Sequence, residues 1–128
     1  MAIPFGVGTE TTVLTLPVVT TQNLQPVKLD GFVQIQAVIP LGLLSYEYGV
    51  NLRIRRNGNL LLTETLRQGN SITLTLSFTQ VSSIPISLVD NNSLLGTNTY
   101  TVTVEFFARS GAGVTITAQS RAINALTI

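Results

Sequence analysis

The side chains that most often carry catalysis are missing from this sequence. It contains no histidine and no cysteine, so the commonest general base, a thiolate nucleophile and the usual zinc ligands are absent. Neither a Ser-His-Asp nor a Cys-His arrangement can form. Among the six acidic residues, Glu47 and Glu64 could approach each other across a hairpin, but pairing with Arg53 or Arg55 explains them better. We expect no enzymatic activity, no cofactor and no bound metal.

Two short motifs resemble ligand sites without meeting their requirements. Asp90-Asn91-Asn92-Ser93 has the residue types of a calcium loop but not its spacing or distal Glu, so a plain turn is favoured. It also contains a glycosylation sequon, which matters only in a secretory pathway. Gly6-Val7-Gly8 has neither the Lys nor the following helix of a phosphate loop.

The cations give no sign of a nucleic-acid partner. Only Arg53, Arg55 and Arg56 cluster, and no aromatic residues alternate with them. The trio is interpreted as the solvated tip of a hairpin. The net charge of +1 creates no acidic or basic field that would favour a charged partner.

The charge content itself is the most unusual property of the chain. Charged residues make up 10% of its 128 residues, against about 25% in typical soluble domains. Thr, Ser, Asn and Gln replace them. Because exposed charge keeps monomers dispersed, we expect the chain to cover much of its surface with copies of itself. An ordinary low-charge secreted β domain remains the alternative.

Neither a membrane span nor a leader is expected. The longest charge-free stretch, residues 68–89, is interrupted by Gly69, Pro85 and alternating Ser and Thr, which do not fit a transmembrane helix. The first residues carry no basic region and no long apolar run, so no signal peptide is predicted. We expect synthesis in the cytosol, followed by retention there or release by lysis.

Apolar residues alternate with polar ones along most of the chain, which predicts strands. Aligned apolar faces include Val33, Ile35, Ala37 and Ile39; Tyr46, Tyr48, Val50, Leu52 and Ile54; Ile72, Leu74, Leu76 and Phe78; Tyr100, Val102, Val104 and Phe106; and Val114, Ile116 and Ala118. About eight strands are predicted, at residues 10–19, 26–39 with a break at Asp30-Gly31, 46–56, 59–67, 71–79, 84–89, 98–108 and 113–127. The predicted fold is an all-β, antiparallel β-sandwich of the jelly-roll type, formed by residues 10–128.

One hairpin can be predicted in more detail. Asn57-Gly58 marks its turn. A type I turn with a glycine bulge, with Gly58 in the left-handed conformation, would pair Ile54 with Leu60. That register keeps the apolar set of both strands on one face.

Residues 1–9 form an apolar arm before the first clear strand. Pro4 keeps the arm out of a central strand, and Gly6 and Gly8 give it freedom to move. The functional interpretation is a connector that plugs a neighbouring subunit and hydrogen-bonds to its open sheet edge, using Ile3, Pro4, Phe5, Gly6, Val7 and Gly8. A frayed terminus, or an arm tucked over its own sandwich, remains the alternative.

Threonine ladders provide the second predicted contact surface. Thr101 and Thr103 lie on the outward face of their strand, as do Thr73, Thr75, Thr115 and Thr117. Thr suits the outer face of a pleated sheet. We expect neighbouring subunits to cover some of these uncharged ladders, Thr101 and Thr103 in particular.

The ending from Tyr100 to Ile128, with Tyr-Thr-Val-Thr-Val-Glu-Phe-Phe-Ala-Arg-Ser-Gly-Ala-Gly-Val-Thr-Ile-Thr-Ala, resembles the last hairpin of small jelly-roll proteins of the Bacillus exosporium, which are similar to the C1q/TNF-like fold. With its apolar arm, the chain resembles the subunits of endospore appendages. The resemblance implies a helical polymer on the spore surface, with spore-surface anchor proteins as further partners and a connector that maps onto Ile3 to Thr9.

Two departures from the resemblance matter. The best-known appendage subunits are cross-linked by cysteines, which this chain lacks, so the resemblance implies a thinner fibre held by non-covalent contacts. The chain also lacks the collagen-like repeat of the exosporium nap glycoprotein. A spore location would explain the absence of a signal peptide, because such coats assemble inside the mother cell and are freed by lysis.

Other classes remain open. A phage or virus capsid or decoration protein, located in the virion, would share the low charge and cytosolic synthesis. A secreted β-sandwich binding module, such as a lectin, would need an exposed aromatic cluster. Tyr46, Tyr48 and Tyr100 instead fall in phase with the apolar faces.

Overall fold

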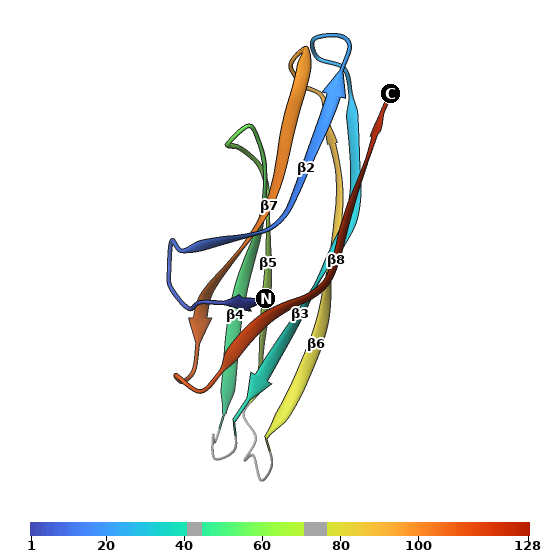
Figure 1. Cartoon of the computed structure of the whole chain (residues 1–128). Coiled ribbons are helices and arrows are strands. Elements are labelled where there is room, and N and C mark those ends of the chain that lie inside the picture. Colours follow the sequence, from blue (N-terminus) through green and yellow to red (C-terminus); the bar gives the residue numbers. More distant parts are fainter. Residues whose placement is uncertain (41–44, 71–76) are drawn as a thin grey trace.

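The computed structural model describes residues 1–40, 45–70 and 77–128, and none of these residues is helical (Figure 1). Within these three segments, eight antiparallel strands form two four-stranded sheets. The β8 sheet contains, in spatial order, β1 (Ala2–Ile3), β8 (Thr115–Thr127), β3 (Val27–Ile39) and β6 (Phe78–Asp90). The β7 sheet contains β2 (Glu10–Thr20), β7 (Gly96–Arg109), β4 (Tyr46–Arg56) and β5 (Asn59–Asn70). The all-β sandwich prediction is confirmed.

The strand pairs are nested along the chain. β1 pairs with β8, β2 with β7, β3 with β6 and β4 with β5. Contacts of β3 with β8 and of β4 with β7 complete the two sheets. The N-terminal strand therefore lies against the C-terminal one, and contacts distant in sequence hold the sandwich together.

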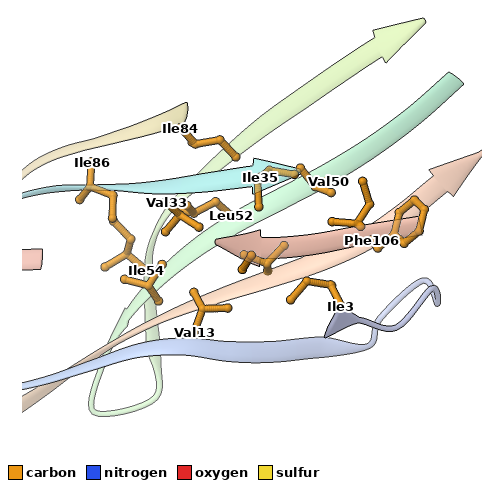
Figure 2. Close-up of a cluster of buried hydrophobic side chains, with 14 of the residues drawn as sticks. Ile3, Val13, Val33, Ile35, Val50, Leu52, Ile54, Ile84, Ile86 and Phe106 are labelled. Atoms are coloured by element: carbon orange, nitrogen blue, oxygen red, sulfur yellow. The ribbon is translucent and has the colours of Figure 1, made fainter. Parts of the chain in front are cut away.

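The core lies between the sheets and is built from the predicted period-two faces (Figure 2). Alternate residues of a strand point to opposite sides of the sheet, and the predicted apolar sets of β3, β4, β7 and the start of β8 are buried. The fully buried side chains come from both sheets and include Val33, Ile35 and Ile39 on β3, Tyr48, Val50, Leu52 and Ile54 on β4, and Tyr100, Val102, Val104 and Phe106 on β7. The predicted inward phase of the three tyrosines is confirmed.

The predicted break of the second long strand is wrong. β3 runs without interruption through Asp30-Gly31 and keeps its pairing with β6 and β8 there. A β-carbon at Gly31 would lie 2.1 Å from the carbonyl oxygen of Ala122 on β8. Gly31 thus permits a close approach of two backbones. Such an approach, like a bulge or a bend, is a known reason for a glycine within a strand.

The predicted division of residues 71–89 also needs correction. Residues 78–90 form one strand, β6, rather than the end of one strand and all of another. Residues 71–76, and with them most of the strand expected at 71–79, lie outside the described residues. Pro85 is accommodated because β6 is the edge strand of its sheet, where a missing N–H is tolerated.

The turn and the register of the β4–β5 hairpin differ from the prediction, although the apolar residues of β4 still point inward. Asn57 and Gly58 have φ values of 49° and 86°, as in a two-residue type I′ turn, whose twist matches that of the strands. Leu60 consequently lies on the outer face, and a bulge at the next residue places Leu62 opposite Ile54. The left-handed Gly58 is confirmed, whereas the type I turn and the pairing of Ile54 with Leu60 are wrong.

A buried ion pair fastens the two sheets near this hairpin. Arg56 on β4 donates to both carboxylate oxygens of Asp90 on β6, at 2.7 and 2.8 Å, and the Tyr100 hydroxyl donates at 2.7 Å. Burial opposes ionisation of Asp90, but the hydrogen bonds from Arg56 and Tyr100 hold its pKa below the usual value. The Arg56 side chain is 11% exposed, so the prediction of a solvated arginine tip is wrong for this residue.

The close approach at Gly31 generates a stability test. Gly31→Ala should lower the unfolding free energy by about 1–3 kcal/mol, because β8 must move away from the new methyl group. Ser83→Ala, exposed on the neighbouring β6, should change stability by less than about 0.5 kcal/mol. Urea unfolding of both variants measures the difference. Equal stabilities would show that β3 and β8 are not packed this closely.

Candidate functional site

The N-terminal arm lies on its own sandwich, as the second of the alternatives for residues 1–9 anticipated. β1 is antiparallel to the start of β8, with Ala2 opposite Thr117. Met1 and Ala118 exchange both backbone hydrogen bonds, at 2.8 and 3.2 Å. Figure 1 shows this N-terminal segment beside β8. The arm thus covers only the beginning of the outer edge of β8.

The apolar side chains of the arm have three different environments. Ile3 is 4% exposed and belongs to the core. Figure 2 shows Ile3 at the same end of the core as Phe106. Phe5 is 41% exposed and Val7 is 79% exposed. Ile3 is therefore the apolar anchor of the arm, while Val7 makes little contact with its own subunit.

Phe5 is held between a ring and a cation. Its ring meets that of Phe106 edge to face, with centroids 5.1 Å apart. The guanidinium carbon of Arg109 lies 4.1 Å from the Phe5 centroid, which is close enough for a cation–π interaction. A shallow, mainly apolar groove of about 470 Å³ runs beside these contacts; its walls include Pro4, Phe5, Phe106, Val114 and Ile116.

A tight turn connects the arm to β2. The Gly6 N–H donates to the carbonyl of Phe106 at 3.0 Å, and the Thr9 N–H donates to the carbonyl of Gly6 at 3.1 Å. Gly8 has a φ of 83°, in the left-handed region that glycine adopts readily. The Gly8 N–H donates to Glu105 at 2.6 Å. The conformational freedom expected of these glycines therefore allows the chain to reverse direction between the arm and β2.

Glu105 on β7 is the charged centre beneath this turn. It is 3% exposed, and its second carboxylate oxygen accepts from Arg53 at 2.6 Å and from Asn51 at 3.1 Å. The Gly8 N–H, followed by the Asn51 amide and the Arg53 guanidinium, lowers the pKa of Glu105 to about 2, against the opposing effect of burial. The carboxylate is therefore ionised over the whole neutral and mildly acidic range.

The outer face of the β7 sheet is more charged than the threonine ladder suggested. Glu10 on β2 pairs with Arg55 and accepts a hydrogen bond from Thr103, which is 7% exposed. Thr101 is half-buried. Thr103 is thus covered by side chains of its own subunit. Coverage of Thr101 by a neighbouring subunit stays a prediction.

The predicted partners of the carboxylates also change. Glu47 pairs with Arg67 at 2.9 Å on the exposed surface, not with Arg53 or Arg55. Those two arginines pair instead with Glu10 and Glu105. Glu64 is half-buried, and burial raises its pKa.

Sequence reasoning missed Glu105, Phe106 and Arg109 as the receptor of the arm. One signal was present: Glu105 is the only charged residue between positions 91 and 108, on a strand that otherwise alternates apolar residues with Thr. A single charge on an uncharged strand face points to a dedicated partner. Its partners, which are Arg53, Asn51 and a backbone N–H near the N-terminus, come from distant parts of the chain and depend on long-range pairing.

An apolar tip lies at one end of the sandwich, where the β2–β3 and β6–β7 loops meet. Leu24 donates its N–H to the Ser93 carbonyl at 2.8 Å, and the fully buried Asn98 accepts from the Leu94 N–H at 2.9 Å. Four large apolar side chains in these loops and at the adjoining end of β2 are more than half exposed: Val19, Leu24, Leu94 and Leu95. An ordered, exposed apolar surface of this kind is typical of an interaction site.

The described residues offer neither a metal-binding cluster nor a membrane-spanning helix. Within residues 1–40, 45–70 and 77–128, no three His, Cys, Asp or Glu side chains are grouped so that they could hold a metal ion. The same residues contain no helix with the length and apolar character needed to cross a bilayer.

Comparison of the sequence with protein-family models and with curated proteins finds no match. Function is therefore inferred from the geometry of the arm and its receptor.

The depressed pKa of Glu105 generates a pH prediction. Its folded-state pKa of about 2 lies below the ordinary 4.5, so its contribution is present above pH 4.5 and is lost as pH falls toward 2. Wild type should lose up to about 3 kcal/mol of stability over this range from Glu105 alone. Glu105→Gln should lack that part of the loss, as measured by urea unfolding at each pH. Parallel pH curves for the two proteins would contradict it.

Proposed function

We propose that the chain is a structural subunit that polymerises by placing its N-terminal arm on the β8 edge of a neighbouring copy. The observation that carries the proposal is the way the arm is attached. Its docked part is a two-residue strand, and a turn with Gly6 and Gly8 separates it from β2. The same contacts can form between chains if this turn opens, which is the exchange of an identical element between protomers.

Exchange of the arm costs little contact energy. Ile3 leaves one core and enters an identical one, so its burial, roughly 1.5–3 kcal/mol, is regained. Phe5 likewise finds the same ring and the same cation. Protein concentration and the loss of turn contacts then decide between the closed subunit and the polymer.

The geometry of exchange allows open chains. Each subunit has one arm to donate and one receptor to fill, and the two are different surfaces. Such a heterologous contact forms a ring if its rotation closes and a filament if it does not. The apolar tip, at residues 19, 24, 94 and 95, supplies a further surface that neighbouring subunits would cover.

The jelly-roll assignment forms part of this proposal. Its support is the nested pairing of the first strand with the last, the second with the seventh, the third with the sixth and the fourth with the fifth. A long hairpin wrapped into two sheets has this order. A jelly roll preceded by an apolar arm is also what the resemblance to endospore appendage subunits implies, and a non-covalent fibre on the spore surface is the corresponding biological role.

Truncation tests the proposal because it removes the donor and leaves the receptor. A chain lacking residues 1–9 should stay folded, since the seven longer strands remain, but it should form no long fibres. Added at a low ratio to the full chain, it should shorten the fibres, because it can accept an arm without donating one. Negative-stain microscopy gives fibre lengths, and circular dichroism checks the fold.

A point variant supplies the matched comparison. Phe5→Asp should also prevent long fibres, since a carboxylate would replace the ring beside Phe106. Val7→Asp, at a position 79% exposed, should have a much weaker effect. Normal fibres from the truncated chain would contradict the connector role, and closed shells from the full chain would favour a capsid protein instead.

A further inference from the structure

The turn at residues 6–9 must open before the arm can leave its own subunit. Three hydrogen bonds close it: Gly6 to the Phe106 carbonyl, Thr9 to the Gly6 carbonyl, and Gly8 to the carboxylate of Glu105. The first two are neutral backbone bonds. The third is charge-assisted, and such bonds are about twice as strong as neutral ones.

The carboxylate of Glu105 is held in place for this bond. Arg53 and Asn51 on the adjacent β4 bind one oxygen, at 2.6 and 3.1 Å, and leave the other directed to the Gly8 N–H at 2.6 Å. The side chain is 4% exposed. A buried, pre-positioned anion thus receives a single backbone donor from the arm.

Gly8 contributes a second requirement for the closed turn. Its φ of 83° lies where L residues are strained, although no atom lies within 4 Å of a β-carbon built there. A connector that reaches a neighbour would run in an extended conformation with a negative φ. The Gly8 bond to Glu105 therefore exists in the closed subunit and not in an extended arm.

We propose that Glu105 is an autoinhibitory latch, which holds the arm on its own subunit and slows its release to a neighbour. A contact present in only one of two states shifts the equilibrium toward that state. Glu105 acts here through the Gly8 N–H and is a positioning residue. The role in assembly rests on the proposed function, whereas the role in holding the arm closed does not.

Two substitutions weaken or remove the hydrogen bond between Gly8 and Glu105, one by changing the acceptor and one by changing the donor. Glu105→Gln removes the charge of the acceptor. Gly8→Pro removes the donor and cannot adopt the positive φ. Glu47→Gln is the matched control, because Glu47 lies on the same sheet face, pairs with Arg67 and does not touch the arm.

Hydrogen exchange of dilute monomer tests the latch by itself. In Glu105→Gln, the Gly8 amide should exchange about tenfold faster or more than in wild type, as expected for losing a bond to a charged group. In Gly8→Pro, the amide of Gly6 should exchange faster by a similar factor. Glu47→Gln should match wild type at both amides. Unchanged exchange in both latch variants would overturn the proposal.

The assembly readout separates the latch from the proposed function. The half-time of fibre formation, followed by light scattering at one concentration, should shorten at least about threefold in both latch variants and stay unchanged in Glu47→Gln. Fibres that form at the wild-type rate in both latch variants would overturn the assembly role of the latch. Faster amide exchange without fibres from any variant or wild type would support the closed latch and overturn the proposed function.

Discussion

The short pairing between β1 and the start of β8 is the interaction on which the position of the arm, and with it the proposed assembly, depends. A sheet edge presents N–H and C=O groups that need partners, and here the partner is a strand of two residues. The arm is held by the buried side chain of Ile3, by the partly exposed ring of Phe5, and by hydrogen bonds of Met1, Gly6 and Gly8. In the proposed polymer, a neighbouring copy would supply the same partner, and an intrachain contact and a subunit contact would then compete for one edge.

The structure shows where the few charges of this low-charge chain lie. Its few charges are concentrated in pairs: Arg56 with Asp90 between the sheets, and Arg53 with Glu105 beneath the arm. The surface that remains is largely uncharged, including the apolar tip. Thr103, chosen from the sequence as an uncharged contact, is instead part of a charged network through Glu10. For the proposed assembly, the arm and the tip are therefore better candidates for subunit contact than the ladder at Thr103.

Local periodicity was enough to predict the inner faces, because burial of alternate side chains decides the orientation of a strand. The inward phase of Tyr48 and Tyr100 followed directly. Turn chemistry was less informative: Asn57-Gly58 predicted a hairpin, but the bulge that corrects its phase depends on packing. The receptor of the arm was unpredictable for a similar reason, since the pairing of Ile3 with Ile116 joins opposite ends of the chain. Likewise, Asp30-Gly31 suggested a turn that would break the strand. The actual role of Gly31, its close approach to β8, cannot be seen in the sequence of one strand.

A cysteine pair at positions 2 and 117 tests exchange of the arm most directly. The natural chain has no cysteine, and Ala2 lies opposite Thr117 in the pair next to the hydrogen-bonded Met1 and Ala118. Such non-hydrogen-bonded pairs have Cα atoms about 4.5 Å apart, within disulfide range. If the arm is exchanged, fibres assembled in reductant and then oxidised give a ladder of covalent oligomers on a non-reducing denaturing gel, while monomers oxidised before assembly form no fibres. Fibres that yield only internally cross-linked monomers would contradict the account.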